Sequence, residues 1–176
     1  MKRMAEFSKV SYNQFHDDWL DTFDALKDET DNDKLEKHLR NIYNGIKLPK
    51  RATAQSAGYD FFSPMSFVLE PNDSIKIPTG IRCEMYDGWV MLLFIRSSLG
   101  FKYGLSMPTS VSVIDSDYFD ADNEGHIMVK LQNNGTKSVR INKGDRIVQG
   151  VFVPYGITLD DDTTTTRNGG VGSSGK

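Results

Sequence analysis

Two kinds of hydrophobic spacing divide the chain. Between residues 11 and 44, apolar side chains recur at helical spacing in two runs, which are Phe15, Trp19, Phe23 and Leu26, then Leu35, Leu39, Ile42 and Tyr43. Ser11 and Gln14 have the spacing of a helix cap, and Gly45 is suited to end the second helix. The pattern predicts a helical hairpin over residues 11–44, with one apolar face and an acidic outer face. Packing against the main body is the favoured interpretation of the apolar face, and an interaction surface is the alternative.

From about residue 46, short apolar runs alternate with turn residues such as Pro, Asn, Asp and Gly. A short strand is expected at residues 6–10, and the further candidate strands are residues 67–69, 75–77, 81–85, 89–95, 111–114, 126–131, 137–141 and 146–153. Such regular spacing of short strands predicts an antiparallel barrel or jelly roll. The apolar pattern ends after Tyr155, so we expect a β domain over residues 1–155 and a flexible C-terminal arm over residues 156–176.

The length of 176 residues fits one globular domain. The lone Cys83 cannot form an internal disulfide, which favours a reducing compartment. The longest apolar run, residues 89–95, is far shorter than the ~20 residues of a membrane helix. No apolar signal segment follows the basic first residues. We therefore expect a cytoplasmic protein with no membrane contact.

The charge is unevenly distributed. The whole chain carries −3, whereas residues 11–44 hold nine acidic and four basic residues, or −5, which leaves +2 elsewhere. No basic stripe of the kind that binds a duplex is visible, so we expect no stable nucleic-acid binding. The slightly basic remainder is suited to a small anion.

Five short segments carry candidate chemistry. They are residues 57–60 (AGYD), 96–100 (RSSLG), 113–118 (VIDSDY), 144–149 (GDRIVQ) and 167–175 (RNGGVGSSG). Each alone has an ordinary explanation, such as a turn, a strand end or a disordered terminus. Together their chemistry converges on a polyphosphate.

Phosphate binding requires positive charge and several hydrogen-bond donors. Arg96 is able to contact phosphate with two N–H groups, and Ser97 and Ser98 add hydroxyls. The tail offers Arg167, Ser173 and Ser174 among glycines, whose backbone N–H groups approach an anion closely. A tail of this kind closes over a bound ligand. The GxxxxGK[ST] phosphate loop is absent, so a P-loop nucleotidase is excluded.

Three polar residues are candidates for hydrolytic chemistry. Asp115 follows an apolar pair and is either a general base that deprotonates water or a turn cap. Asp60 is suited to hold Mg²⁺ through its water shell. Gln149 either orients water or phosphate, or is a satisfied polar residue of the core.

The remaining candidates favour structural roles. Asp120, Asp122 and Glu124 lie in a predicted hairpin tip, and their spacing favours a solvated turn over a calcium site. The three histidines are isolated and lack zinc-site spacing, and no nucleophile elbow is present. Cys83 lies in an apolar strand pattern and is expected in the core.

Taken together and in this order, the five segments resemble the motifs of the trimeric dUTP pyrophosphatases (dUTPases). The resemblance implies an all-β protein, a distorted jelly-roll β-barrel of the dUTPase type, here with an inserted N-terminal helical hairpin. It implies a homotrimer in which each active site is built from three chains. It also implies Mg²⁺-dependent hydrolysis of dUTP to dUMP and pyrophosphate, which keeps uracil out of DNA and supplies dUMP for thymidylate synthesis.

The resemblance assigns roles to individual residues. Asp115 matches the aspartate that activates the water attacking the α-phosphate, and Tyr118 matches the tyrosine whose ring lies under the deoxyribose. The segment from Ser112 and Val113 to Asp115, with the return strand after Gly125, matches the hairpin whose backbone reads uracil. Matches to phosphate-binding positions are Arg96, Ser97, Ser98, Gln149, Arg167, Gly172, Ser173 and Ser174. Asp60 matches the aspartate near the metal's water shell.

The chain departs from the family pattern at several positions. Ser98 and Ser112 stand where glycine is usual, and Val171 replaces the tail aromatic that stacks on uracil. The hairpin tip after Tyr118 is several residues longer than in the compact form of the family. The helical pair at 11–44 is an insertion.

Two alternatives remain open at this point. A dCTP deaminase shares the fold, but Lys130 stands where its catalytic glutamate would fall. A regulatory protein of the same fold is the second, with a protein partner bound through the acidic helical insertion.

Overall fold

The computed structural model describes residues 3–23 and 32–169 of the 176-residue chain. Its helices are α1 (Tyr12–Thr22), α2 (Asn32–Asn44), α3 (Ser97–Tyr103) and the 3₁₀ helix η2 (Ser116–Asp120). Its strands are β1 (Ala5–Lys9), β2 (Lys50–Arg51), β3 (Tyr59–Phe62), β4 (Phe67–Leu69), β5 (Ser74–Pro78), β6 (Ile81–Met85), β7 (Trp89–Ile95), β8 (Leu105–Ser106), β9 (Ser112–Ile114), β10 (Met128–Asn133), β11 (Val139–Ile141) and β12 (Arg146–Pro154).

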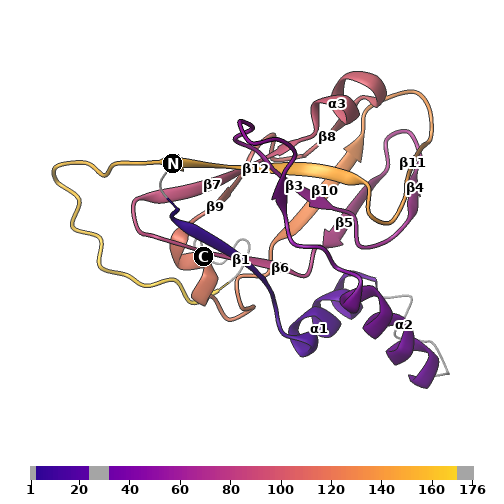
Figure 1. The fold of residues 1–176 in the computed structure, drawn as a ribbon, viewed down its shortest axis with the longest axis horizontal. Helices are drawn as coiled ribbons and strands as arrows, with labels where there is room; N and C mark the ends of the chain where they lie inside the picture. The colour runs from indigo at the N-terminus through magenta and orange to yellow at the C-terminus, as the bar shows by residue number, and fades with distance from the viewer. Residues whose placement is uncertain (1–2, 24–31, 170–176) are drawn as a thin grey trace.

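The β body consists of small antiparallel sheets around one core (Figure 1). The largest sheet has the order β2-β3-β12-β7-β9, and a second has the order β5-β10-β8. Two further pairs are β1-β6 and β4-β11. Non-consecutive neighbours dominate these orders, as expected for a jelly roll rather than a meander.

The predicted strands are confirmed where the apolar pattern is clear. The runs at 67–69, 81–85 and 89–95 coincide with β4, β6 and β7. The run predicted at 126–131 instead begins at Met128, because His126 and Ile127 belong to the hairpin tip before β10. The sequence interpretation did not include α3, β2, β3 or β8, which are all short.

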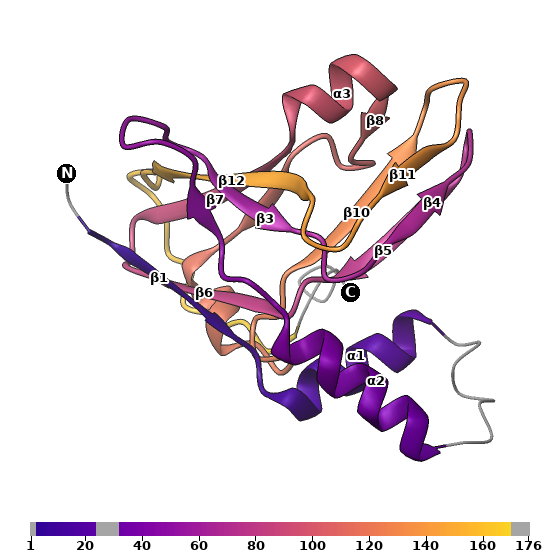
Figure 2. The same ribbon diagram turned by 45° about the vertical axis from the view of Figure 1, so that its right-hand side comes forward.

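The helices α1 and α2 lie side by side at one end of the β body (Figure 2). Ser11 caps α1, since its side-chain oxygen accepts the backbone N–H of Gln14 at 3.1 Å, as predicted. Phe15, Trp19 and Leu39 are almost fully buried. The apolar stripe is therefore core, and the packing interpretation is confirmed. Leu26 and the connection at 24–31 lie outside the described residues.

The outer face of the helices remains polar. Asp17 and Asp21 have side chains that are three-quarters exposed. The protein partner expected at this segment stays a prediction, and it would have to meet this acidic face rather than the apolar one.

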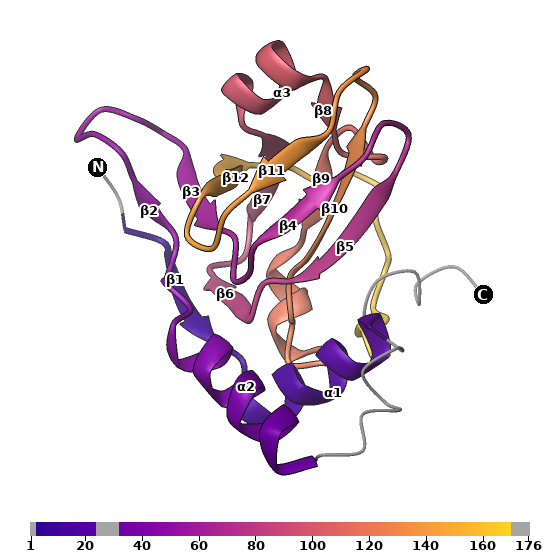
Figure 3. The same ribbon diagram turned by 90° about the vertical axis from the view of Figure 1, so that its right-hand side faces the viewer.

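After β12 the chain continues as an extended arm. The arm leaves the end of β12, loops away from the body and returns to η2 (Figures 1 and 3). No helix among the described residues is long and apolar enough to span a membrane.

Candidate active site

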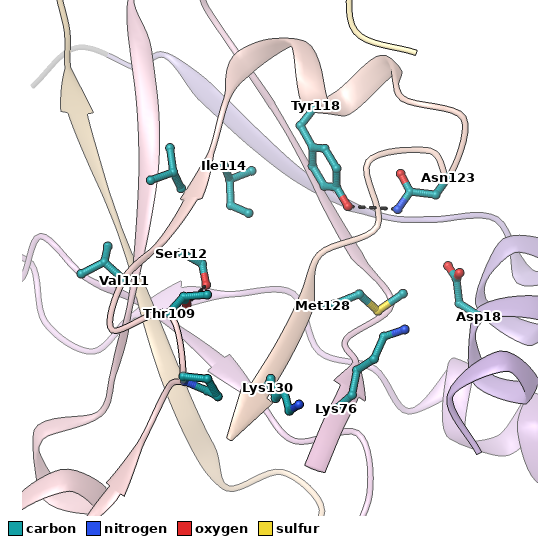
Figure 4. A pocket seen from close by; sticks show the side chains of 12 residues that line it. Asp18, Lys76, Thr109, Val111, Ser112, Ile114, Tyr118, Asn123, Met128 and Lys130 are labelled. Atoms are coloured by element: carbon teal, nitrogen blue, oxygen red, sulfur yellow. Dashed lines mark hydrogen bonds between the residues drawn. The ribbon is translucent and has the colours of Figure 1, made fainter. Parts of the chain in front are cut away.

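A cavity of about 560 Å³ opens between β9 and the start of β10 (Figure 4). Its walls come from the segment before β9, from the hairpin tip, from β5 and from α1. The lining residues are Asp18, Lys76, Pro108, Thr109, Val111, Ser112, Val113, Ile114, Tyr118, Asn123, Met128 and Lys130. The predicted site residues Ser112, Val113 and Tyr118 therefore line one cavity, opposite Met128 on the return strand.

Tyr118 is fixed at the wall of this cavity by two hydrogen bonds. Its hydroxyl donates to the backbone carbonyl of His126 at 2.8 Å and accepts the side-chain N–H of Asn123 at 2.9 Å. The ring is buried, and burial raises the pKa of the phenol. Gly125 permits this arrangement because its φ is +65° and a Cβ there would lie 2.6 Å from the Tyr118 carbonyl oxygen.

Asp115 lies at the junction of β9 and η2. Its side chain is half exposed, at 48%. Arg167, from the arm, donates to Asp115 at 2.7 Å and to Asp117 at 2.9 Å. The predicted base and the predicted phosphate-binding arginine of the arm are thus direct neighbours.

Asp60 lies buried on β3 between two arginines. The carboxylate is 3% exposed, and its two oxygens accept Arg96 at 2.5 Å and Arg146 at 3.3 Å. No group of three or more His, Cys, Asp or Glu side chains suited to a metal ion occurs in the described parts of the chain. Both oxygens of Asp60 are therefore occupied by guanidinium groups, and they do not fit direct coordination of Mg²⁺.

Four of the predicted phosphate-binding residues, Arg96, Ser97, Ser98 and Gln149, lie at the Asp60 end of the sheet. Gln149 on β12 is the register partner of Asp60 on β3, and Ser97 and Ser98 follow Arg96 as the exposed first residues of α3. A Cβ at Gly58 would lie 2.6 Å from the Gln149 side-chain oxygen, so a larger residue there would displace the end of the Gln149 side chain. The buried Nε of Arg96 has no hydrogen-bond partner among the described residues.

The site residues thus form two clusters at opposite ends of β7. Ile114 pairs with Met91, so Asp115 lies beside Val90 near the start of the strand. Arg96 immediately follows the other end, after Ile95. At about 3.3 Å per residue, these ends are roughly 20 Å apart. Within one chain, Asp115 and Arg96 do not share a site.

The hairpin tip is partly solvated and partly docked. Asp120 and Asp122 are exposed, as expected for a solvated turn, whereas Glu124 is bonded to the start of α1. Glu124 accepts both the backbone N–H (2.7 Å) and the hydroxyl (2.6 Å) of Ser11. His126 is fully buried and bonds Asp18 of α1 at 2.5 Å. The tip therefore packs on the start of α1. Sequence reasoning missed this contact because the histidine and the aspartate are 108 positions apart.

Two further predictions concern the tail residues and Cys83. Gly172, Ser173 and Ser174 lie outside the described residues. Cys83 is buried as predicted, and burial raises the pKa of its thiol to about 12. The thiol is therefore inert at neutral pH.

A family model and two curated proteins show similarity to dUTPases. The dUTPase family model matches residues 44–175. The deoxyuridine 5'-triphosphate nucleotidohydrolase of Lactococcus lactis is 42% identical over 134 residues, which cover 74% of this chain and 89% of that protein. The protein of the same name from Tolumonas auensis is 38% identical and covers 77% of this chain and 91% of that protein.

Solved structures show the same similarity. The Streptococcus mutans dUTPase has a TM-score of 0.60 and 39% identity, covering 67% of this chain and 91% of that chain. A mutant dUTPase of S. aureus phage phi11, which coordinates a structural Mg(II) ion, shares the fold with a TM-score of 0.57 and 24% identity, covering 69% of this chain and 92% of that chain. The predicted all-β fold type is confirmed, and α1 with almost all of α2 precedes the matched region.

Proposed function

The chain belongs to the dUTPase family, and from this premise we propose that it hydrolyses dUTP to dUMP and pyrophosphate with Asp115 as the general base. The observation that carries this proposal is the position of Asp115. It directly follows β9, whose Ser112 and Val113 line the cavity that Tyr118 closes. A carboxylate in that position reaches the phosphate end of a nucleotide whose base lies between β9 and β10.

The cavity supports recognition of a pyrimidine deoxynucleoside. Ser112 on β9 and Met128 on β10 lie on facing walls, and both strands have backbone groups near the cavity. Backbone groups arranged for uracil would leave polar groups unpaired against cytosine, which can reject a ligand by roughly 10⁴-fold or more. The hydroxyl of Tyr118 is held by two hydrogen bonds, which supports a role for its ring under the sugar, where it would disfavour a 2′-hydroxyl.

Arg167 supports a role for the arm in the reaction cycle. In the structure it bonds the carboxylates of Asp115 and Asp117. A triphosphate offers it a stronger, multiply charged partner. Transfer of Arg167 to phosphate would free Asp115 to accept a proton from water, which then attacks the α-phosphorus while pyrophosphate leaves. Gly172, Ser173 and Ser174 would add donors from the same arm.

The separation of the two clusters supports a homotrimer with composite sites. Arg96, Ser97, Ser98 and Gln149 are suited to phosphate. They lie roughly 20 Å from Asp115 along β7 of the same chain. A site that contains both clusters therefore requires the Arg96 end of one protomer to meet the Asp115 end of another.

Magnesium is proposed to arrive with the triphosphate. Mg²⁺ commonly binds through substrate phosphates and retained waters, and it screens phosphate charge. Asp60, buried between Arg96 and Arg146, is suited to orient these arginines. Its predicted contact with a water of the metal stays a prediction.

A pyrophosphate-release assay across the deoxynucleoside triphosphates tests the proposal. We expect release from dUTP with Mg²⁺ and little from dCTP, dTTP or UTP. Chelation with EDTA should stop the reaction, and added Mg²⁺ should restore it. The deaminase alternative has less support, because Lys130 lines the cavity where a glutamate would be needed. Ammonia release from dCTP, with dUTP left intact, would overturn our assignment.

A further inference from the structure

The helix α1, which precedes the matched family region, reaches the wall of the nucleoside cavity through Asp18. We propose that Asp18 is a positioning residue of the nucleotide site: through His126, it holds Tyr118 and the start of β10 in the geometry that receives the deoxynucleoside. The proposal rests on the dUTPase function stated above. Under this proposal, the helical insertion contributes to nucleotide binding as well as to the hydrophobic core.

The contact between Asp18 and His126 has a defined direction. The Nε2 of His126 accepts the backbone N–H of Gly80 at 2.7 Å, so the ring proton of the neutral imidazole is on Nδ1. Nδ1 then donates to Asp18. His126 is 0% exposed. Removal of the Asp18 carboxylate would therefore leave a buried N–H group without an acceptor, which is costly.

Asp18 is itself held in place. Gln14, one turn earlier in α1, donates its side-chain N–H to the same carboxylate oxygen at 2.9 Å. Burial alone would raise the pKa of Asp18, but the hydrogen bonds from His126 and Gln14 outweigh it, so the pKa is lowered. Asp18 remains a charged acceptor at neutral pH.

His126 connects Asp18 to two parts of the cavity wall, Tyr118 and the start of β10. Its backbone carbonyl accepts the hydroxyl of Tyr118, the residue predicted to lie under the sugar. Two residues later the chain enters β10 at Met128, which lines the cavity. Figure 4 shows Asp18, Asn123, Tyr118 and Met128 along one side of the space. Displacement of the His126 ring would therefore move the sugar wall and the base wall together.

A second contact joins the same two segments independently. Glu124 of the hairpin tip binds the N–H and the hydroxyl of Ser11, the residue that caps α1. The longer tip and the inserted helix are two of the departures from the family pattern, and they dock on each other. Packing of Phe15 and Trp19 accounts for the attachment of α1. It does not account for a carboxylate directed at the cavity wall, because burial of a charged group costs free energy unless it is paired.

Steady-state kinetics of three variants test the proposal. We expect Asp18→Ala to raise KM for dUTP roughly tenfold, the effect of one lost charged hydrogen bond, with kcat changed by less than about threefold. The preference for dUTP over UTP should fall as well, since Tyr118 loses its support. Asp18→Asn keeps a carbonyl acceptor for His126 and should recover most of KM. Asp17→Ala, on the exposed face of the same helix, is the matched control and should behave as wild type.

Unchanged KM and unchanged dUTP preference in Asp18→Ala would overturn the proposal. An equal effect in Asp17→Ala would overturn it too, because the helix would then act only through stability.

A binding measurement keeps the test valid should Asp18→Ala fail to fold. Trp19 adjoins Asp18 and is buried, so in a Trp89→Phe variant the only tryptophan reports on α1. Titration with dUMP should change Trp19 emission saturably, and a flat response with bound dUMP would contradict the coupling. Wild-type protein that hydrolyses no dUTP would instead refute the proposed function itself. Hydrolysis by wild type with no response at Trp19 and no change in KM refutes the coupling alone.

Discussion

In the proposed mechanism, Arg167 controls whether the Asp115 carboxylate is free to act as a base. In the structure the guanidinium group bonds both Asp115 and Asp117, and its centre lies 5.7 Å from the centroid of the Tyr118 ring. Under the proposed mechanism, a substrate phosphate competes with the two carboxylates for Arg167. Arm closure would then release the Asp115 carboxylate to act as the base.

The variant Asp115→Asn separates chemistry from binding. We expect turnover to fall by on the order of 10²–10⁴, because asparagine does not accept the proton of the attacking water. Fold and dUTP affinity should persist, as measured by circular dichroism and by calorimetric titration. Asp117→Asn is the control, since Asp117 also binds Arg167 but is given no role in proton transfer. Near-normal turnover of Asp115→Asn would remove this residue from the mechanism.

The individual site residues could be predicted only where they lie in contiguous motifs. Ser112, Val113 and Tyr118 do line one cavity, and Arg96 is beside Asp60. Asp18 and His126 could not be paired from one sequence, because contacts between distant positions leave no local pattern. Nor could one sequence predict that Arg96 and Arg146 both bond the buried carboxylate of Asp60.

At the scale of elements, the docking of α1 on the hairpin tip should depend on pH. Burial opposes the charge of Glu124, but hydrogen bonds from Ser11 outweigh burial and lower its pKa. A carboxyl whose folded-state pKa is depressed stabilises the fold above its unfolded pKa, and this stabilisation is lost as pH falls through the folded value.

The variant Glu124→Gln tests this dependence. We expect wild type to melt at a higher temperature than the variant at pH 7. The difference should shrink from about pH 4.5 downward, as Glu124 becomes protonated in wild type. Asp122→Asn, a change at an exposed neighbour in the tip, should show a smaller difference at pH 7. If the difference in melting temperature between wild type and Glu124→Gln did not change with pH, the role of this carboxylate would be contradicted.

Elements with a clear apolar pattern were predictable, whereas elements without one were not. The strands β4 and β7 are apolar runs, β6 alternates apolar and charged residues, and the apolar residues of α1 and α2 recur at helical spacing. The helix α3 has seven residues and contains Gly100, which weakens helix propensity, so its sequence gives no clear signal. The two-residue strands β2 and β8 exist only through their partners in the sheets.

For the whole molecule, the arm should be required for activity but not for assembly. Truncation after Thr166 removes Arg167 and the glycine-rich tail but leaves every strand intact. We expect the truncated chain to elute as wild type in size-exclusion chromatography with light scattering. Its turnover should fall on the order of 10²-fold or more, as after loss of a charge-stabilising donor. Full activity after truncation would refute the role of the arm in closure.

The proposed composite site predicts that Asp115 and Arg96 of one active site come from different protomers. Asp115→Asn and Arg96→Ala each disable one cluster, and the clusters lie at opposite ends of β7. If a site combines Asp115 of one protomer with Arg96 of the next, unfolding and refolding an equal mixture of the two variants restores some intact sites. Random assembly of a cyclic trimer should make about a quarter of the sites intact. The control is Asp115→Asn mixed with a chain that carries both substitutions, which leaves no intact site. If sites are shared between protomers, the mixture of the two single variants should be much more active than this control mixture. Equal activity of the two mixtures would mean that each chain completes its own site.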